Sequence, residues 1–251
     1  MELVDKLSNR QYIDGEWVES SNKNTRDIIN PYNQETIFTV AEGTKEDVER
    51  AILAARRSFE DGEWSLETSE VRGKKVRAVA DKIKENREEL AKLETLDTGK
   101  TLEESYADMD DIHNVFMYFA GLADKDGGEI INSPIPNAES KVVKEPVGVV
   151  TQITPWNYPL LQASWKIAPA LATGCSLVMK PSEITPLTTI RVFELMEEVG
   201  FPKGTINLVL GAGSEVGDVM SGHEEVDLVS FTGGIETGKH IMKQAADRKS
   251  V

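Results

Sequence analysis

Four short segments of the sequence carry residues that could bind a ligand or take part in catalysis. They are TPWNYP at 154–159, KPSE at 180–183, GAGS at 211–214 and TGG at 232–234. Each follows a short apolar run, so each would lie where a strand passes into a helix. In an open parallel sheet, ligands bind outside the carboxyl ends of the strands, beside the amino ends of the helices. The pattern therefore predicts that a ligand binds along these four segments.

Two of the segments contain glycine turns that could cradle a phosphate. Gly211, Gly213 and Gly217 are spaced one residue too widely for the G-x-G-x-x-G fingerprint, and such a near miss is more often a plain turn into a helix. Gly233 and Gly234 fit better, because two glycines let the backbone approach closely and the next helix offers free N–H groups. The turn at 232–234 is therefore the stronger candidate for phosphate binding.

Lys180 and Glu183 end the second apolar run of this region. A carboxylate there can accept hydrogen bonds from a ribose diol and would repel a 2′-phosphate, which favours NAD over NADP. The alternative is that Lys180 ends a strand and Glu183 caps a helix, both with structural roles only. Position alone gives the two interpretations equal weight.

The elements that would hold these segments follow a regular order from residue 147 onward. The apolar runs VGVVTQIT, CSLVMK, TINLVL and VDLVSF alternate with helical segments that start near Pro159, Pro186, Ser214 and Ile235. Runs that are apolar at nearly every position are typical of strands covered on both faces. The fold class predicted is α/β, with a doubly wound parallel sheet of the Rossmann type.

The first part of the chain has a different pattern. Asp14-Gly15 between extended segments predicts a hairpin, and Thr44 followed by Asp47 predicts a capping box at a helix start. Helical spacing then continues to a stop at Thr98-Gly99, and a third helix carries apolar residues from Met109 to Phe119. Glycines and prolines at 124–146 predict an excursion, either a β-ribbon or a linker. We divide the chain into 1–123, 124–146 and a core at 147–251.

Composition excludes several classes of function. A formal net charge of -15 disfavours nucleic acid and anionic membranes as partners. The sequence shows neither a signal peptide nor a spanning segment, and its single cysteine, Cys175, suits a reducing cytoplasm. Three scattered histidines give no zinc-ligand spacing. A cytoplasmic protein with a small-molecule ligand is expected.

Three long motifs resemble the aldehyde dehydrogenase superfamily in order and spacing, and within it the betaine aldehyde dehydrogenases. They are ITPWNYPLLQASWKIAPALATGCSLVMKPSEITPLT, GFPKGTINLVLGAG and VDLVSFTGGIETGKHI. The resemblance extends over essentially the whole chain. It implies the NAD-binding domain of an enzyme that oxidises an aldehyde, and homo-oligomers, dimers or tetramers, for full-length members. For the subgroup it implies betaine aldehyde as substrate and glycine betaine as product.

The resemblance also implies roles for particular residues. Asn157 matches the amide that helps to form an oxyanion hole, and Lys166 matches a lysine given a charge-relay role. The residues that match the NAD site are Ile153, Thr154, Pro155, Trp156, Lys180, Pro181, Ser182, Glu183, Gly211, Phe231, Gly233, Gly234, Ile235, Glu236 and Thr237.

Two further sites are implied by the subgroup. Tyr158 and Trp165 match two walls of an aromatic box that binds a trimethylammonium group by cation–π attraction. Without the resemblance, they would be read as ordinary core aromatics. The subgroup also implies a site for a monovalent cation such as potassium, formed mainly by carbonyl oxygens of Ile28, Asp97 and Ile184.

The family's chemistry requires a cysteine nucleophile and a glutamate base in an E-L-G-G-K segment. That segment does not occur in the 251 residues, and Cys175 opens an apolar run at the end remote from the ligand loops. We therefore expect the catalytic domain to be absent here and the 251 residues to be inactive alone. Three hypotheses stay open: part of an aldehyde dehydrogenase, a stand-alone NAD-binding or interaction module, and a non-functional remnant.

Overall fold

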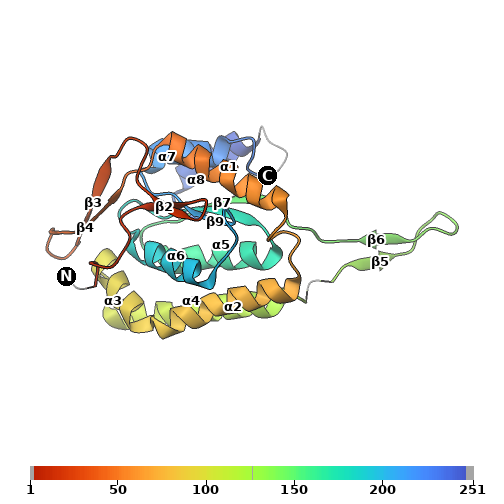
Figure 1. The fold of residues 1–251 in the computed structure, drawn as a ribbon, viewed down its shortest axis with the longest axis horizontal. Helices are drawn as coiled ribbons and strands as arrows, with labels where there is room; N and C mark the ends of the chain where they lie inside the picture. The colour runs from red at the N-terminus through yellow and green to blue at the C-terminus, as the bar shows by residue number, and fades with distance from the viewer. Residues whose placement is uncertain (1–2, 126, 247–251) are drawn as a thin grey trace.

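Four parallel strands form the centre of the chain, as the apolar runs predict. The computed structural model describes residues 3–125 and 127–246. Its main sheet has the order β10-β7-β8-β9-β1-β2 and lies between layers of helices (Figure 1). The parallel strands are β7 (Val149–Ile153), β8 (Ser176–Lys180), β9 (Ile206–Leu208) and β10 (Leu228–Phe231).

Alternate residues of the strands face two separate apolar cores. Val149, Ile153 and Val178 pack with helices on one face, whereas Val150 and Leu177 pack with helices on the other. The first face is covered by α1 (Lys45–Asp61), α7 (Gly213–Gly222) and α8 (Ile235–Ala246). The second is covered by α5 (Pro159–Thr173) and α6 (Leu187–Val199), and then by α2 (Ser69–Glu85), α3 (Arg87–Thr98) and α4 (Leu102–Leu122). The doubly wound α/β fold is confirmed.

One strand departs from the expectation that every apolar run is covered on both faces. β7, β8 and β9 are buried throughout, but β10 is only partly buried and its Leu228 is 39% exposed. The reason is position, since β10 is an edge strand and pairs only with β7 among the described residues. The apolar run therefore predicted this strand correctly, but the strand is less buried than predicted.

The first hairpin extends the main sheet on its other side. β1 (Gln11–Ile13) and β2 (Glu16–Val18) are joined by Asp14 and Gly15, which both have positive φ, as a two-residue hairpin turn requires. β1 pairs antiparallel with β9, with Tyr12 opposite Leu208. The sequence predicts the hairpin but not its place in the sheet.

The helical segments follow the predicted signals with one difference. Thr44 and Asp47 form the reciprocal capping box at the start of α1, and Gly99 ends α3 in the left-handed conformation. The apolar spacing that leads to Gly99 after α1 belongs to two helices, α2 and α3, because the chain breaks at Asn86. The side-chain amide of Asn86 donates to the carbonyl of Lys82, which is the local competition that ends helices at asparagine.

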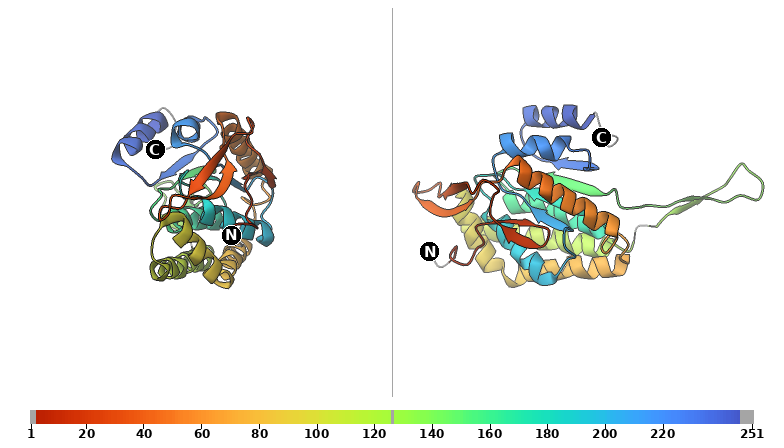
Figure 2. Two further views of the ribbon diagram at one scale, coloured as in Figure 1. Left: turned by 90° about the vertical axis from the view of Figure 1, so that its left-hand side faces the viewer. Right: turned by 45° about the horizontal axis from the view of Figure 1, so that its top comes forward.

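Two small antiparallel ribbons complete the structure. β3 (Thr25–Ile29) pairs with β4 (Thr36–Ala41), and β5 (Glu129–Ile131) pairs with β6 (Ser140–Val142). The second ribbon projects from the body of the molecule (Figure 2). Residues 247–251, at the end of the predicted core, lie outside the described residues. In the part of the chain that the structure describes, no helix has the length and apolar character needed to span a bilayer.

We predict that Gly43→Ala destabilises the chain by about 1–3 kcal/mol, because a methyl group there overlaps the Leu210 carbonyl oxygen and Gln11 Oε1. The matched control is Gly121→Ala in α4, where the added methyl meets nothing within 4 Å. It should stabilise by up to about 1 kcal/mol through helix propensity. Urea unfolding measures both changes, and equal effects of the two substitutions would contradict the packing argument.

Candidate functional site

Backbone hydrogen bonds bring three of the four predicted loops together at the carboxyl edge of the sheet. The N–H of Thr154 donates to the carbonyl of Lys180 at 3.2 Å, and the N–H of Thr232 donates to that of Ile153 at 3.1 Å. The loops after β7, β8 and β10 therefore begin side by side. This is the edge at which open α/β sheets bind ligands.

The loop after β7 presents polar and aromatic groups at the start of α5. Trp156 is 57% exposed and Asn157 is exposed, while Thr154 and Ile153 below them are buried. Pro159 occupies the first turn of α5, where its missing N–H costs nothing. The hydroxyl of Thr185 donates to the carbonyl of Trp156 at 3.0 Å and so ties this loop to the one after β8.

A buried ion pair marks the end of β8. Lys180 is only 2% exposed, and its Nζ donates to Glu183 Oε2 at 3.2 Å and to the Pro181 carbonyl at 2.9 Å. Burial lowers the pKa of Lys180, against the raising effect of Glu183. Burial raises the pKa of Glu183, but the charge of Lys180 and the hydrogen bonds to the carboxylate outweigh this effect, so the pKa is lowered overall. Glu183 is therefore an ionised acceptor, as binding of a ribose diol requires.

A narrow hollow brings four of the predicted cofactor residues together. Its lining includes Pro181, Ser182, Glu183 and Gly211, with Arg26 and Glu42. Neither Arg26 nor Glu42 belongs to a motif that the sequence indicates. They lie about 140–185 residues before the others, so no local motif could have indicated them.

The two glycine turns differ in what they offer an anion. Gly233 and Gly234 are exposed, and at the start of α8 the N–H of Gly238 donates to the Gly234 carbonyl. The N–H groups of Ile235, Glu236 and Thr237 belong to the first turn of α8, where no preceding turn supplies a carbonyl acceptor. They are therefore suited to binding a phosphate. At the other turn, the N–H of Ala212 already donates to Glu42 Oε1 at 3.0 Å.

Lys166 reaches from α5 to the carboxyl end of β10. Its Nζ donates to Thr232 Oγ1 at 2.8 Å, and Ser230 Oγ lies 3.4 Å away. Burial lowers the pKa of Lys166. A buried amine with a lowered pKa releases its proton more readily than an exposed lysine does. Phe231, between the two hydroxyl residues, packs against the core below α8.

The predicted aromatic pair is placed in two different settings. Trp165 is 51% exposed and lines a hollow of about 500 Å³ with α4 residues that include Asp111, Asn114 and Tyr118. Tyr158 is not part of that lining. Lys100 Nζ lies 4.1 Å from the centre of its ring, and the Tyr158 hydroxyl bonds Glu104 Oε1 at 3.2 Å. A box with both walls stays a prediction.

Asp111, Asn114 and Tyr118 are residues that the sequence analysis missed. They recur at helical spacing on the face of α4 opposite the buried Met109, Ile112 and Phe116. That spacing was the available signal, because it places an acid, an amide and a phenol on one side of a helix whose other side is core.

One of the three predicted cation residues, Asp97, has a buried carboxyl. Asp97 is 2% exposed, its Oδ2 accepts from the N–H of Leu187 at 2.9 Å, and its Oδ1 has no partner among the described residues. This bond brings Asp97 to the loop that contains Ile184, whereas Ile28 is buried in β3. Within 3–125 and 127–246, no cluster of three or more acids, histidines or cysteines could hold a metal. A site there would have to use carbonyl oxygens.

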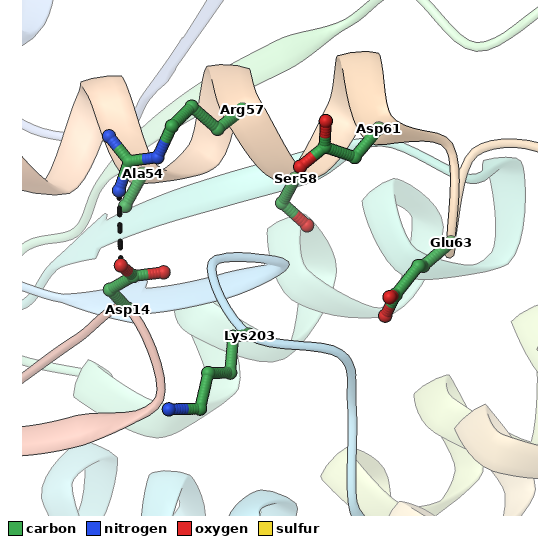
Figure 3. A pocket seen from close by; sticks show the side chains of 7 residues that line it. All are labelled: Asp14, Ala54, Arg57, Ser58, Asp61, Glu63 and Lys203. Carbon is green, nitrogen blue, oxygen red and sulfur yellow. Dashed lines mark hydrogen bonds and ion pairs between the residues drawn. The ribbon is translucent and has the colours of Figure 1, made fainter.

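Two other groups lie away from this edge. Cys175 is 2% exposed and directly precedes β8, at the opposite end from the ligand loops, as expected. The second is a charged hollow of about 220 Å³, in which Asp14 pairs with Arg57 at 3.0 Å. Figure 3 shows the side chains that line it. Lys203 in its lining precedes β9, so this hollow is also at the amino end of the strands.

A buried carboxyl of α3 makes stability depend on pH. Burial raises the pKa of Glu94 from 4.5 to about 7. The folded chain thus binds a proton between these pH values that the unfolded chain does not, so the free energy of unfolding falls as pH rises from about 4.5 to 7. Glu94→Gln, which can still accept from the Thr188 hydroxyl, should remove a decline on the order of 1–3 kcal/mol.

Denaturant unfolding from about pH 5 to 8 measures this difference between variant and wild type. Glu85→Gln is the control, because it makes the same chemical change at an exposed residue of α2 and should leave the wild-type profile unchanged. Parallel profiles for Glu94→Gln and wild type would refute the assignment.

Comparison with known proteins confirms the resemblance inferred from the motifs. A family model described as the aldehyde dehydrogenase family matches residues 17–251. The betaine aldehyde dehydrogenase of Bacillus subtilis (strain 168) is 65% identical over 240 residues, which cover 96% of this chain and 49% of that protein. A peroxisomal aminoaldehyde dehydrogenase of Pisum sativum is 46% identical over 248 residues, with coverages of 96% and 49%.

Among solved structures, a betaine aldehyde dehydrogenase from Staphylococcus aureus in complex with NAD+ is 88% identical with a TM-score of 0.98. The match covers 99% of this chain and 50% of that one. The chain spans about half the length of the curated relatives it matches. The family model matches nearly the whole chain, and the structural neighbour has the same fold. The chain belongs to the aldehyde dehydrogenase family.

Proposed function

We propose that this chain supplies the NAD-binding half of an enzyme that oxidises betaine aldehyde to glycine betaine. The observation that carries the proposal is the convergence of three features at one sheet edge: the Lys180–Glu183 pair, the amino end of α8 and the Asn157 loop. The Staphylococcus aureus relative, 88% identical, is a betaine aldehyde dehydrogenase in complex with NAD+. The cofactor and the substrate class are carried over from it.

Each feature has a distinct task in this proposal. NAD, when bound, accepts the hydride that the aldehyde loses. Glu183 accepts hydrogen bonds from the adenosine ribose, and the first N–H groups of α8, after Gly233 and Gly234, bind the pyrophosphate. Asn157 donates its side-chain N–H to the oxyanion that forms when the carbonyl is attacked. Lys166, buried beside Thr232, holds or passes a proton at its Nζ.

The substrate's trimethylammonium group would lie against Trp165. A quaternary ammonium has no hydrogen-bond donor, so aromatic faces are its natural partners. Trp165 is half exposed in a hollow that also contains Asp111, whose charge complements a cation. Tyr158 would supply the second wall through the ring face that Lys100 does not cover.

We further propose that the 251 residues bind NAD without turnover when they are isolated. The only cysteine of the sequence, Cys175, is buried at the amino end of β8 and cannot reach a substrate at the carboxyl edge. The stand-alone module and the remnant stay as alternatives. A potassium ion at the Ile28, Asp97 and Ile184 carbonyls, a homo-oligomeric state and a cytoplasmic location stay predictions from the sequence.

Saturable binding of NAD+, measured by calorimetry, tests the cofactor site. Glu183→Gln should weaken this binding by about tenfold, because a charged acceptor of ribose hydrogen bonds becomes a neutral one. Glu139→Gln is the matched control, since it also removes a glutamate paired with a lysine, but on the β5–β6 ribbon. The absence of saturable binding to the folded wild-type chain would refute the proposal.

Binding of choline, which carries the trimethylammonium group of betaine aldehyde, tests the role of Trp165. Trp165→Ala should raise its Kd about fivefold or more, corresponding to about 1 kcal/mol of cation–π attraction. The uncharged alcohol with a tert-butyl group in place of trimethylammonium should lose much less affinity. Titrations followed by NMR give both constants. Equal losses for the two ligands would show that apolar contact with the ring, and not cation–π attraction, binds the group.

A further inference from the structure

An ion pair that the proposed function does not use lies in the hollow beside Glu183. Arg26, on β3, donates to both carboxylate oxygens of Glu42, from Nε at 2.5 Å and from a terminal nitrogen at 2.7 Å. Glu42 directly follows β4, and both residues line the same hollow as Glu183 and Gly211. Such a two-point pair fixes the plane of the guanidinium as well as its position.

Glu42 is held in place from a second direction. Its Oε1 accepts the N–H of Ala212, the residue that precedes α7, at 3.0 Å. The next residue, Gly43, donates its N–H to the Leu210 carbonyl at 3.0 Å. The carboxylate thus occupies the anion-binding position that the Gly211–Gly213 turn would offer to a phosphate.

The pair is electrostatically coupled to the predicted ribose ligands. The hydrogen bond to Glu42 raises the pKa of Arg26, and the charge of Glu183 adds to that effect. The charge of Glu42 in turn raises the pKa of Lys180, and the charge of Arg26 lowers it. Three charged residues, Arg26, Glu42 and Glu183, therefore line the hollow, and Lys180 pairs with Glu183. Of the two cations, Arg26 has the more exposed side chain, at 35% against 3% for Lys180.

We propose that Glu42 determines the preference of this site for a ribose without a 2′-phosphate, by holding the Arg26 guanidinium and by adding a second negative charge beside Glu183. This inference rests on the proposed NAD site and names a determinant of its specificity. A free arginine beside the ribose is the group that accommodates a 2′-phosphate in dinucleotide sites. Arg26 has the chemistry for that role but is already neutralised by Glu42.

A purely structural role is the competing explanation. The pair joins the β3–β4 ribbon to the turn before α7, and it could serve only to hold the ribbon there. If the pair has only a structural role, its loss should lower the stability of the chain and weaken the binding of NAD+ and NADP+ equally. A specificity determinant changes the ratio of the two affinities.

Calorimetric titration of the full chain with NAD+ and NADP+ separates these explanations. Glu42→Gln keeps the shape and an acceptor for the Ala212 N–H, but removes the charge that holds Arg26. The ratio of the NADP+ to the NAD+ dissociation constant should fall by about tenfold or more, the effect of one charge-assisted hydrogen bond to phosphate. The double variant Arg26→Gln/Glu42→Gln, which lacks the cation, should lose most of that gain.

Two further variants complete the design. Glu89→Gln removes a glutamate from a similarly buried pair with Arg191, neither of which lines the hollow, and should leave the ratio unchanged. Glu42→Asp keeps the charge but shortens the reach, and should lower the ratio less than Glu42→Gln does. It provides the measurement if Glu42→Gln does not fold. An unchanged ratio in the Glu42 variants, with NAD+ binding intact in the wild type, overturns the inference. Failure of the wild type to bind NAD+ overturns the proposed function instead.

Discussion

Ile153 of β7 pairs with Phe231 on one side and with Lys180 on the other, and this register aligns the carboxyl ends of three strands. Parallel pairing leaves little freedom here, because a slip of one residue would turn every side chain to the opposite face. The two cores on either side of the sheet accept only one such arrangement. The position of the loops after β7, β8 and β10 is thus a consequence of core packing, and the loops themselves need only the right residue types.

Burial of charge is the second constraint on this edge. Lys180 and Lys166 are nearly enclosed, and an amine without partners in such a place would cost several kcal/mol. Each has partners that come from a neighbouring loop or strand, Glu183 for the first and Thr232 for the second. The polar groups are therefore fixed before a ligand arrives, which lowers the entropy lost on binding.

Local signals in the sequence predicted the local features well. The capping box at Thr44, the turn at Asp14-Gly15, the stop at Gly99 and the parallel strands all follow from short patterns. Contacts between distant segments could not be predicted in this way. The pairing of β1 with β9 and the Glu42–Ala212 bond each join residues about 170–200 positions apart, and nothing in either segment specifies the other. Family resemblance, rather than physical pattern, indicated Asn157 and Lys166.

The place of the first hairpin has a consequence for how the chain is made. Tyr12 is synthesised nearly two hundred residues before its partner Leu208. At about 5–20 residues per second, the hairpin must wait roughly 10–40 s for β9. During that time the apolar side chains of Tyr12 and Ile13, both buried in the finished fold, have no sheet to join. The first hairpin can therefore join the main sheet only after β9 has been synthesised.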